Sequence, residues 1–392
     1  MADRFSYFIS MKFKKSNQLF TISISLLSIV LFLLPTGFEN PILVEKNQRV
    51  KALILETNNE DLHTHAVVTV GTQDLKMEIS EGKFKGDTLN AHNVLMGQKK
   101  LDKIFKEGDK VLAVLTTNKQ KDKVISARAD DFYRINIELI LFALFAIFLI
   151  VFAGLTGFKA LLSFVFTALS IWKVLIPLLL KGFNPILISL LILAFTTAVI
   201  IILINGFSKK GFVALTGSLS GICITGFLAV LFGYFFNIPG TVKDFSETLL
   251  YTGFTNLKIT DIFISGIFIS AAGAVMDVAM DISASQNEVV LKKPEIGTKE
   301  LITSGFHIAY PVIGTMTTTL LFAYSGGFMF LFMALMAKGT PMVSIFNTNF
   351  IAAEILNTLV GSFGLVLVAP ITAIVGGYIY TSKSKKTTGA LA

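Results

Sequence analysis

The chain has 392 residues, of which 53% are hydrophobic and 15% are charged, and its mean hydropathy is +0.70. Soluble domains carry charge on about a quarter of their residues, so this composition argues against a soluble globular protein. The formal net charge of +8 is better explained by lysines flanking membrane helices than by a nucleic-acid surface. The single cysteine, Cys223, lies in an apolar run, which leaves the chain neither a disulfide nor a thiolate metal cluster.

The N-terminal segment has the pattern of a membrane anchor. An uncharged run from Gln18 to Leu34 follows a basic stretch, and the next residues, PTGF, offer no small-x-small cleavage motif. We therefore expect residues 1–37 to form a cytoplasmic N-terminus and an uncleaved anchor helix. A secretory signal peptide stays open as the alternative, because the apolar run is short.

Residues 38–133 differ in composition and hold most of the acidic side chains. Short alternating apolar runs are separated by turn signals such as Glu107-Gly108-Asp109; they lie at 50–56, 64–71, 75–80 and 110–117. The pattern predicts a small extracytoplasmic all-β domain, either a barrel or a sandwich. A metal site built from Asp61, His63, His65 and His92 is a weak hypothesis without further ligands.

From Ile135 onward the chain is nearly all apolar, and we expect a helical membrane bundle over 134–382 with a cytoplasmic basic tail at 383–392. The expected spans are about 135–156, 158–180, 184–206, 211–236, 259–284, 304–325 and 349–380. With the anchor, the fold class is a predominantly α-helical polytopic membrane protein of about eight transmembrane helices.

Two segments fit no span. Residues 241–258 have the pattern of an amphipathic outer loop or surface helix. Residues 326–338 either extend the preceding helix beyond a break at Gly326-Gly327 or fold back as a half-helix.

Lysine and arginine predict the orientation of the spans. About thirteen of them lie in the segments expected inside: Arg4, Lys12, Lys14, Lys15, Lys159, Lys209, Lys210, Lys292, Lys293, Lys299, Lys383, Lys385 and Lys386. About four lie in the short segments expected outside: Lys181, Lys243, Lys258 and Lys338. The positive-inside rule therefore places both termini in the cytoplasm and residues 38–133 outside.

The sixth span, SGIFISAAGAVMDVAMDISASQNE at 265–288, carries the strongest functional signal. Its first half is uncharged, and Asp277, Asp281 and Glu288 then follow on one helical face below small residues. Ionised carboxylates facing lipid cost a few kcal/mol or more, so we expect them to face protein or a water-filled cavity. Asp277 and Asp281 are one turn apart and can share a proton or a cation. The alternative is that the helix ends near Asp277 and both acids meet water on the inner side.

The seventh and eighth spans add further candidates. Thr315 and Thr318 lie on a polar stripe with His307, and Pro311 removes a backbone donor, so this helix can line an ion or substrate path. The alternative is that the threonines bond back to their own helix and that His307 is interfacial. The eighth span supplies Glu354 and Asn357, expected near the outer face and therefore far from Asp281.

No phosphate-binding glycine loop and no HExxH motif occur, and Asp277 and Asp281 share one helix, so ATPase and intramembrane hydrolase are disfavoured.

Three blocks carry a resemblance to a known family: GAVMDVAM at 273–280, GTMTTTLLFAYSGG at 314–327 and EILNTLVGSFGLVLVAPITA at 354–373. With the anchor, outer domain and bundle, the chain resembles the YibE/F-like family of bacterial multi-pass membrane proteins. The resemblance implies a bacterial plasma-membrane protein, usually described as a transporter or permease. This chain has Tyr310 and Pro311 where the family's commonest pattern has an arginine–aspartate pair, and Thr318 where an asparagine is common. We therefore expect a divergent member, working with a second family member or as a homo-oligomer.

Two functions are weighed on these residues. The leading one is a secondary transporter or permease without enzymatic activity or cofactor, coupled to protons or sodium. Its candidate transport residues are Asp277, Asp281, Glu288, His307, Thr315, Thr318, Glu354 and Asn357. The alternative is a non-transporting receptor or assembly subunit whose outer β domain binds a partner. The lipid bilayer is an expected partner in both, and nucleic acid in neither.

Overall fold

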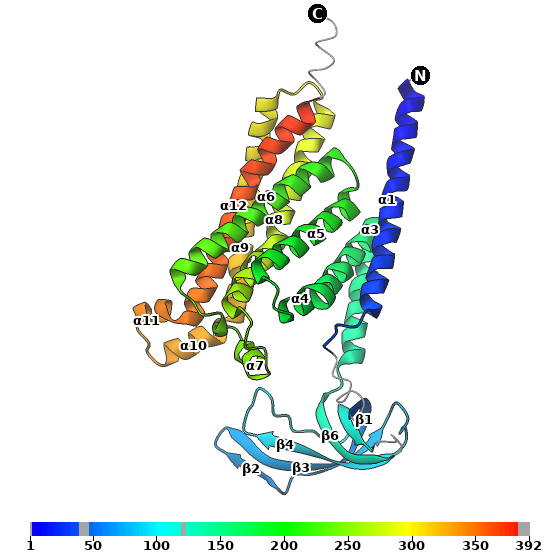
Figure 1. The fold of residues 1–392 in the computed structure, drawn as a ribbon, viewed down its shortest axis with the longest axis vertical. Coiled ribbons are helices and arrows are strands. Elements are labelled where there is room, and N and C mark those ends of the chain that lie inside the picture. The colour runs from blue at the N-terminus through cyan, green and yellow to red at the C-terminus, as the bar shows by residue number, and fades with distance from the viewer. Residues whose placement is uncertain (1, 39–46, 119–122, 383–392) are drawn as a thin grey trace, which may run out of the picture. The chain divides into compact units, whose positions relative to one another are not determined.

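The computed structural model describes residues 2–38, 47–118 and 123–382. The chain divides into two compact units, Gly37–Leu149 and the remainder, each shown as a ribbon in Figure 1. The basic tail expected at 383–392 lies outside the described residues.

The smaller unit contains a β-barrel. Its strands are β1 (Asn47–Asn58), β2 (Leu62–His65), β3 (Val68–Ile79), β4 (Thr88–Met96), β5 (Lys110–Thr117) and β6 (Val124–Phe132). Their order is β1-β5-β6-β4-β3-β2, and β1 also pairs with β3, so the sheet closes with β2 as an appended hairpin strand. The β4–β6 pair is parallel and the other pairs are antiparallel. Of the two expected architectures, the barrel is therefore the one observed.

The residues that face the barrel core explain why the sequence pattern indicates some strands more clearly than others. The run at 110–117 forms β5, but the run expected at 64–71 is wrong as a single strand, because a turn with Ala66 at φ 52° divides it into β2 and β3. Strands β4 and β6 turn small or polar residues inward, such as Ala91, Asn93 and Ala129. These inward residues give a weaker apolar alternation than leucine or isoleucine would.

The larger unit is helical and contains both long and short helices. In chain order they are α1 (Ala2–Leu33), α3 (Ile135–Ser170), the π-helix η1 (Ile171–Leu175), α4 (Ile176–Leu180), α5 (Pro185–Asn205), α6 (Lys209–Phe236), the 3₁₀ turn η2 (Gly240–Val242), α7 (Ser246–Tyr251), α8 (Ile259–Lys292), α9 (Thr298–Gly327), α10 (Met329–Ala337), α11 (Met342–Asn347) and α12 (Asn349–Thr381). The first part of α3 belongs to the barrel unit by chain contacts.

Within the described residues, seven helical stretches are long and apolar enough to cross a membrane. One of them, Ile135–Leu180, has 46 residues, about twice the length that a single crossing needs. It is interrupted at Gly154, where φ 57° and ψ −131° are not helical. The expected helix boundary at 156–158 therefore falls close to an actual break in the backbone.

Short helical elements form in the two segments that fit no predicted span. Residues 241–258 contain η2 and the surface helix α7. The segment 326–338 forms a separate nine-residue helix, α10, after α9 ends at Gly327. Figure 1 shows α7, α10 and α11 gathered at one end of the helical unit.

Helices α6, α8 and α12 form the centre of the bundle, with α5 and α9 packed around them. The contact between α6 and α12 depends on glycine. A Cβ at Gly217 would overlap the hydroxyl of Thr372, and a Cβ at Gly364 would overlap that of Thr225. Both hydroxyls donate to their own helix, Thr225 to Gly221 O and Thr372 to Val368 O, each at 2.8 Å. Each helix thus places a threonine over a glycine of the other, and the two backbones approach closely.

Hydrogen bonds gather four chain segments at the opposite end of the bundle. Phe207 N donates to Asn17 Oδ1 at 3.1 Å, which joins α1 to the α5–α6 turn. Ser283 Oγ and the Tyr380 hydroxyl are 2.9 Å apart, and Thr298 Oγ1 and Thr381 Oγ1 are 2.8 Å apart. Lys209 Nζ, just after the α5–α6 turn, donates to Ile379 O at 3.3 Å. This turn, the middle of α1, the start of α9 and the end of α12 therefore lie together.

We predict that Gly364→Ala and Gly217→Ala each destabilise the helical unit by about 1–3 kcal/mol, because the added methyl overpacks the α6–α12 contact. Thermal unfolding in detergent, followed by circular dichroism, measures the loss. Gly314→Ala is the matched control, since no atom lies within 4 Å of an added Cβ there. Equal unfolding temperatures for the three variants would contradict the proposed contact.

Asp131 gives the barrel a predicted pH dependence. Burial raises its pKa, but hydrogen bonds from Lys103, the Phe132 N–H and Arg134 outweigh burial and lower the pKa below its usual value. A carboxyl whose pKa is lowered by folding stabilises the folded state above its unfolded pKa of about 4, and this contribution is lost as pH falls through the folded pKa.

We therefore expect Asp131→Asn to weaken the barrel at neutral pH and to flatten the loss of stability below about pH 4. Hydrogen exchange of barrel peptides in the full chain, corrected for intrinsic rates, measures both effects. Asp61→Asn, at an exposed position of the same unit, is the control. An unchanged pH profile in Asp131→Asn would contradict the assignment.

Candidate functional site

An ion pair links the loop after α6 to the first turns of α12. Lys243 Nζ donates to Glu354 Oε1, and the side chains are 44% and 11% exposed, respectively. Lys243 is the residue that follows η2, whereas Glu354 lies within a helix of membrane-spanning length. A charge buried in such a bundle is costly unless it is paired, so the pair fixes the loop on α12.

A chain of polar contacts continues from this pair into the bundle. Asn357 Nδ2 lies 3.5 Å from Glu354 Oε2, and Asn357 Oδ1 accepts a hydrogen bond from Ser270 Oγ at 3.1 Å. The Tyr324 hydroxyl donates to Ser270 Oγ at 3.0 Å. The chain therefore joins the loop, α12, α8 and α9 through five side chains.

A cavity of about 540 Å³ adjoins these polar groups. Lys243, Ser270 and Asn357 line it, and much of the remaining wall is apolar, including Phe263 and Ile267. Small-molecule sites in proteins typically combine an apolar wall of this size with a few convergent polar groups. The arrangement can therefore hold a ligand against Lys243, Asp244 and the buried amide of Asn357.

Local packing positions the loop that carries Lys243. Gly240 lies against the backbone of Ile259 and Thr260, where a Cβ would overlap, and its N–H donates to Thr260 Oγ1 at 3.2 Å. Phe245 adopts a left-handed conformation at φ 63° immediately before α7. The loop is therefore fixed on the start of α8 three residues before the lysine.

The structure separates the other candidates from this site. Asp277, Asp281 and Glu288 are exposed on the surface of this chain, because α8 turns its apolar face, with Val275 and Ile282, toward the core. The described residues cover the two aspartates only in part, so full protein cover for them requires a second chain. The expectation that they face protein or a water-filled cavity therefore stays a prediction.

The seventh-span candidates also lie on the surface. His307, Thr315 and Thr318 are exposed, and α9 continues through Pro311. Thr315 Oγ1 donates to Pro311 O at 3.1 Å and Thr318 Oγ1 to Gly314 O at 3.3 Å. Of the two readings of these threonines, the structure shows the one in which they bond to their own helix.

The sequence indicated Glu354, Asn357 and the stripe that contains Ser270, but it did not indicate Lys243 or Tyr324 as site residues. Lys243 lies in a loop and Tyr324 in an apolar helix end, and only the fold brings them together. The signal available in the sequence was Glu354 itself, because a glutamate in an apolar helix requires a partner cation or proton.

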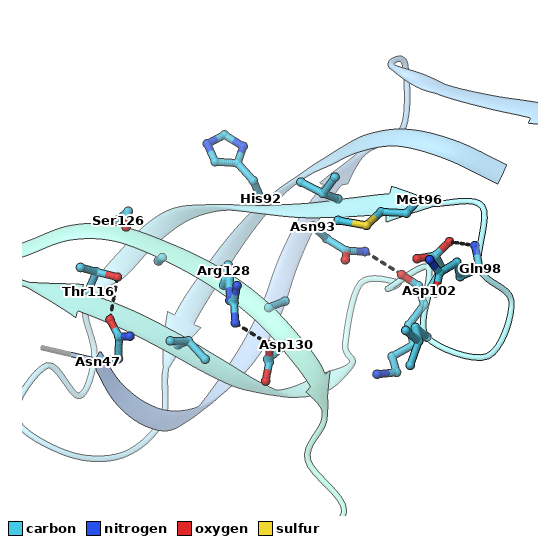
Figure 2. A pocket seen from close by; sticks show the side chains of 16 residues that line it. Asn47, His92, Asn93, Met96, Gln98, Asp102, Thr116, Ser126, Arg128 and Asp130 are labelled. Carbon is cyan, nitrogen blue, oxygen red and sulfur yellow. Dashed lines mark hydrogen bonds and ion pairs between the residues drawn. The ribbon is translucent and has the colours of Figure 1, made fainter. Parts of the chain in front are cut away.

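The barrel unit has a separate pocket, shown in Figure 2, with a volume of about 750 Å³. It is lined from β4, β5, β6 and the loop after β4, and Arg128 lies 3.1 Å from Asp130 within it. Within the described ranges no three His, Cys, Asp or Glu side chains are grouped for a metal, and His92 instead lies 2.7 Å from Asp74.

Fold and site together define a polytopic helical protein of membrane type with an N-terminal β-barrel. Residues 141–382 match the YibE/F-like protein family, and residues 44–132 match the YibE/F family N-terminal domain. The chain belongs to the YibE/F-like family, as its sequence blocks predicted. No curated protein and no solved structure matches it.

We predict that Lys243→Met destabilises the helical unit toward the lower end of about 3–5 kcal/mol, because it leaves a buried carboxylate unpaired while the lysine itself is partly exposed. The double variant Lys243→Met, Glu354→Met should recover part of the loss, since neither charge then remains. Lys338→Met, at an exposed loop position, is the control and should change stability by less than about 0.5 kcal/mol. Additive losses in the double variant would contradict the pairing.

Proposed function

We propose that this protein is a secondary transporter or permease without enzymatic activity, and that its substrate site is the cavity beside Lys243 and Glu354. The observation that carries the proposal is the polar chain from the buried Glu354 and Asn357 to Ser270, which meets a cavity between the loop after α6 and the first part of α8. Intramembrane ionisable residues facing a bundle interior typically mark substrate or ion pathways. A polar site next to the short helices α10 and α11 also resembles the interrupted helices of known carriers.

The proposed topology has eight crossings in a bacterial plasma membrane, with both termini in the cytoplasm and the barrel outside. Support comes from the break at Gly154, which divides the 46-residue stretch into two helices of crossing length. Lysine-rich turns join α5 to α6 and α8 to α9 at the end of the bundle that holds the start of the apolar stretch of α1 (Ser16–Leu33) and the end of α12. The positive-inside rule assigns that end to the cytoplasm.

We further propose that Asp277 and Asp281 provide the coupling site for protons or sodium, covered by a second copy of this chain or by another family member. Helix α8 has 34 residues, about 51 Å, which exceeds a hydrocarbon core of about 30 Å. Its last turns, with Glu288, therefore leave the hydrocarbon, while Asp277 lies closer to the membrane interior. An exposed carboxylate at that depth favours association that removes it from lipid.

The second candidate function is a receptor or assembly subunit that binds a partner through the barrel. The specific observation in its favour is the 750 Å³ pocket between β4, β6 and the loop after β4. A minimal carrier does not require such a surface. The same barrel would serve either function, so flux measurements must separate them.

We expect proteoliposomes with the full chain to show ²²Na⁺ uptake or potential-driven proton entry, read by trapped pyranine, above the rate of empty liposomes. Glu354→Gln should abolish that flux because it removes the charge of the substrate site. Glu295→Gln, at an exposed position in the turn between α8 and α9, is the control and should retain it. Rates equal to those of empty liposomes for both ions would refute ion-coupled transport.

Two further variants test the remaining assignments. Flux that survives the double variant Asp277→Asn, Asp281→Asn would refute these acids as the coupling site. Deletion of residues 45–128 should leave residual flux in a transporter, whereas a receptor should lose all partner binding.

A further inference from the structure

We propose that the Lys243 ammonium occupies a site built for the organic ammonium group of a ligand, which must displace Lys243 to bind. The inference rests on the proposed function, because it names the substrate class of the same cavity. In the observed arrangement, the protein's own lysine takes the place of the ligand cation.

The surroundings of the ammonium are those of a cation site. Lys243 Nζ lies 5.7 Å from the ring centroids of both Phe263 and Phe328, and it is paired with the Glu354 carboxylate. Aromatic faces together with a carboxylate are a recurring way to recognise an ammonium group. A bare sodium ion would instead favour several oxygen ligands, so the two rings point to an organic ammonium.

The two partners differ in how they are held. Glu354 is almost fully buried on α12 and contacts Asn357, whereas Lys243 is 44% exposed and belongs to a loop. Lysine has a flexible four-carbon stem, so its ammonium can leave by side-chain rotation alone. Gly240 and Thr260 hold the loop through backbone packing, which does not involve the lysine side chain.

The cavity provides the space that displacement requires. Lys243 lines it together with Asp244, Ser270 and Asn357, and its volume of about 540 Å³ exceeds the needs of one ammonium group. Glu354 and Phe328 are not in its wall, so a bound ammonium group reaches them only from the position that Lys243 now holds. Its apolar wall, which includes Ile262 and Leu249, suits a ligand with a hydrocarbon part. A purely structural ion pair would not need an open space beside it.

Amine labelling of the purified full chain tests displacement in the native protein. Butyltrimethylammonium is the probe, because it carries the proposed cation and does not react with amine reagents. We expect it to raise the acetylation rate of Lys243 several-fold, read by mass spectrometry, and to leave Lys338 unchanged. Sodium chloride at equal ionic strength should have no such effect. An unchanged Lys243 rate, or an equal rise with sodium, would overturn the proposal.

Thermal unfolding provides the second measurement. Butyltrimethylammonium should raise the unfolding temperature of Lys243→Met more than that of the native chain, because the ligand no longer competes with the lysine. Glu354→Gln should show no shift. A shift of the same size in Glu354→Gln would overturn the site. Probe binding without ion flux would leave this inference standing and count against transport, so the two failures are distinguishable.

Discussion

The close approach of α6 and α12 is the constraint on which the polar site depends. In lipid, helices gain little from hydrophobic burial against one another, so packing and polar contacts decide their association. Gly217 and Gly364 let threonines of the opposite helix pack directly against backbone. Lys243 follows the end of α6 and Glu354 lies on α12, so the spacing of these two helices sets whether the charges meet.

Besides the polar chain from Lys243 to Tyr324, the described part of the bundle holds two further kinds of polar group. Gln286 is fully buried and donates to Leu301 O and Ala373 O at 3.1 and 3.0 Å, in a space left open by Gly305 and Gly376. Such contacts join α8, α9 and α12 and are explained by packing alone. Asp277 and Asp281 lie on the outward face of α8, where the described residues leave them exposed. The Gln286 contacts stabilise the fold. The exposed aspartates are the groups that association with another chain would stabilise most.

Much of the helical unit was predictable because long apolar runs and their lysine flanks encode it directly. The site was only partly predictable. Glu354 stands out as an acid in an apolar helix, but its partner lies 111 positions earlier in a loop, and no local pattern records that contact. The acidic stripe of α8 was read correctly as one face, yet which face packs inward is decided by neighbouring helices. Local periodicity shows which residues share one face of a helix, but tertiary packing decides whether that face points toward the core.

Helix α8 connects the two functional regions under the proposed function. Ser270 contacts Asn357 in the cavity, and Asp277 lies two turns further along the same helix, about 10 Å away. Val275 and Ile282 are fully buried in the core shared with α12, and α8 is continuous between Ser270 and Asp277. Under the proposed function, a ligand that shifts Ser270 would act on Asp277 through this packed helix. Coupling between the cavity and the acidic face then needs no contact between Glu354 and the aspartates, because the helix itself is the shared element.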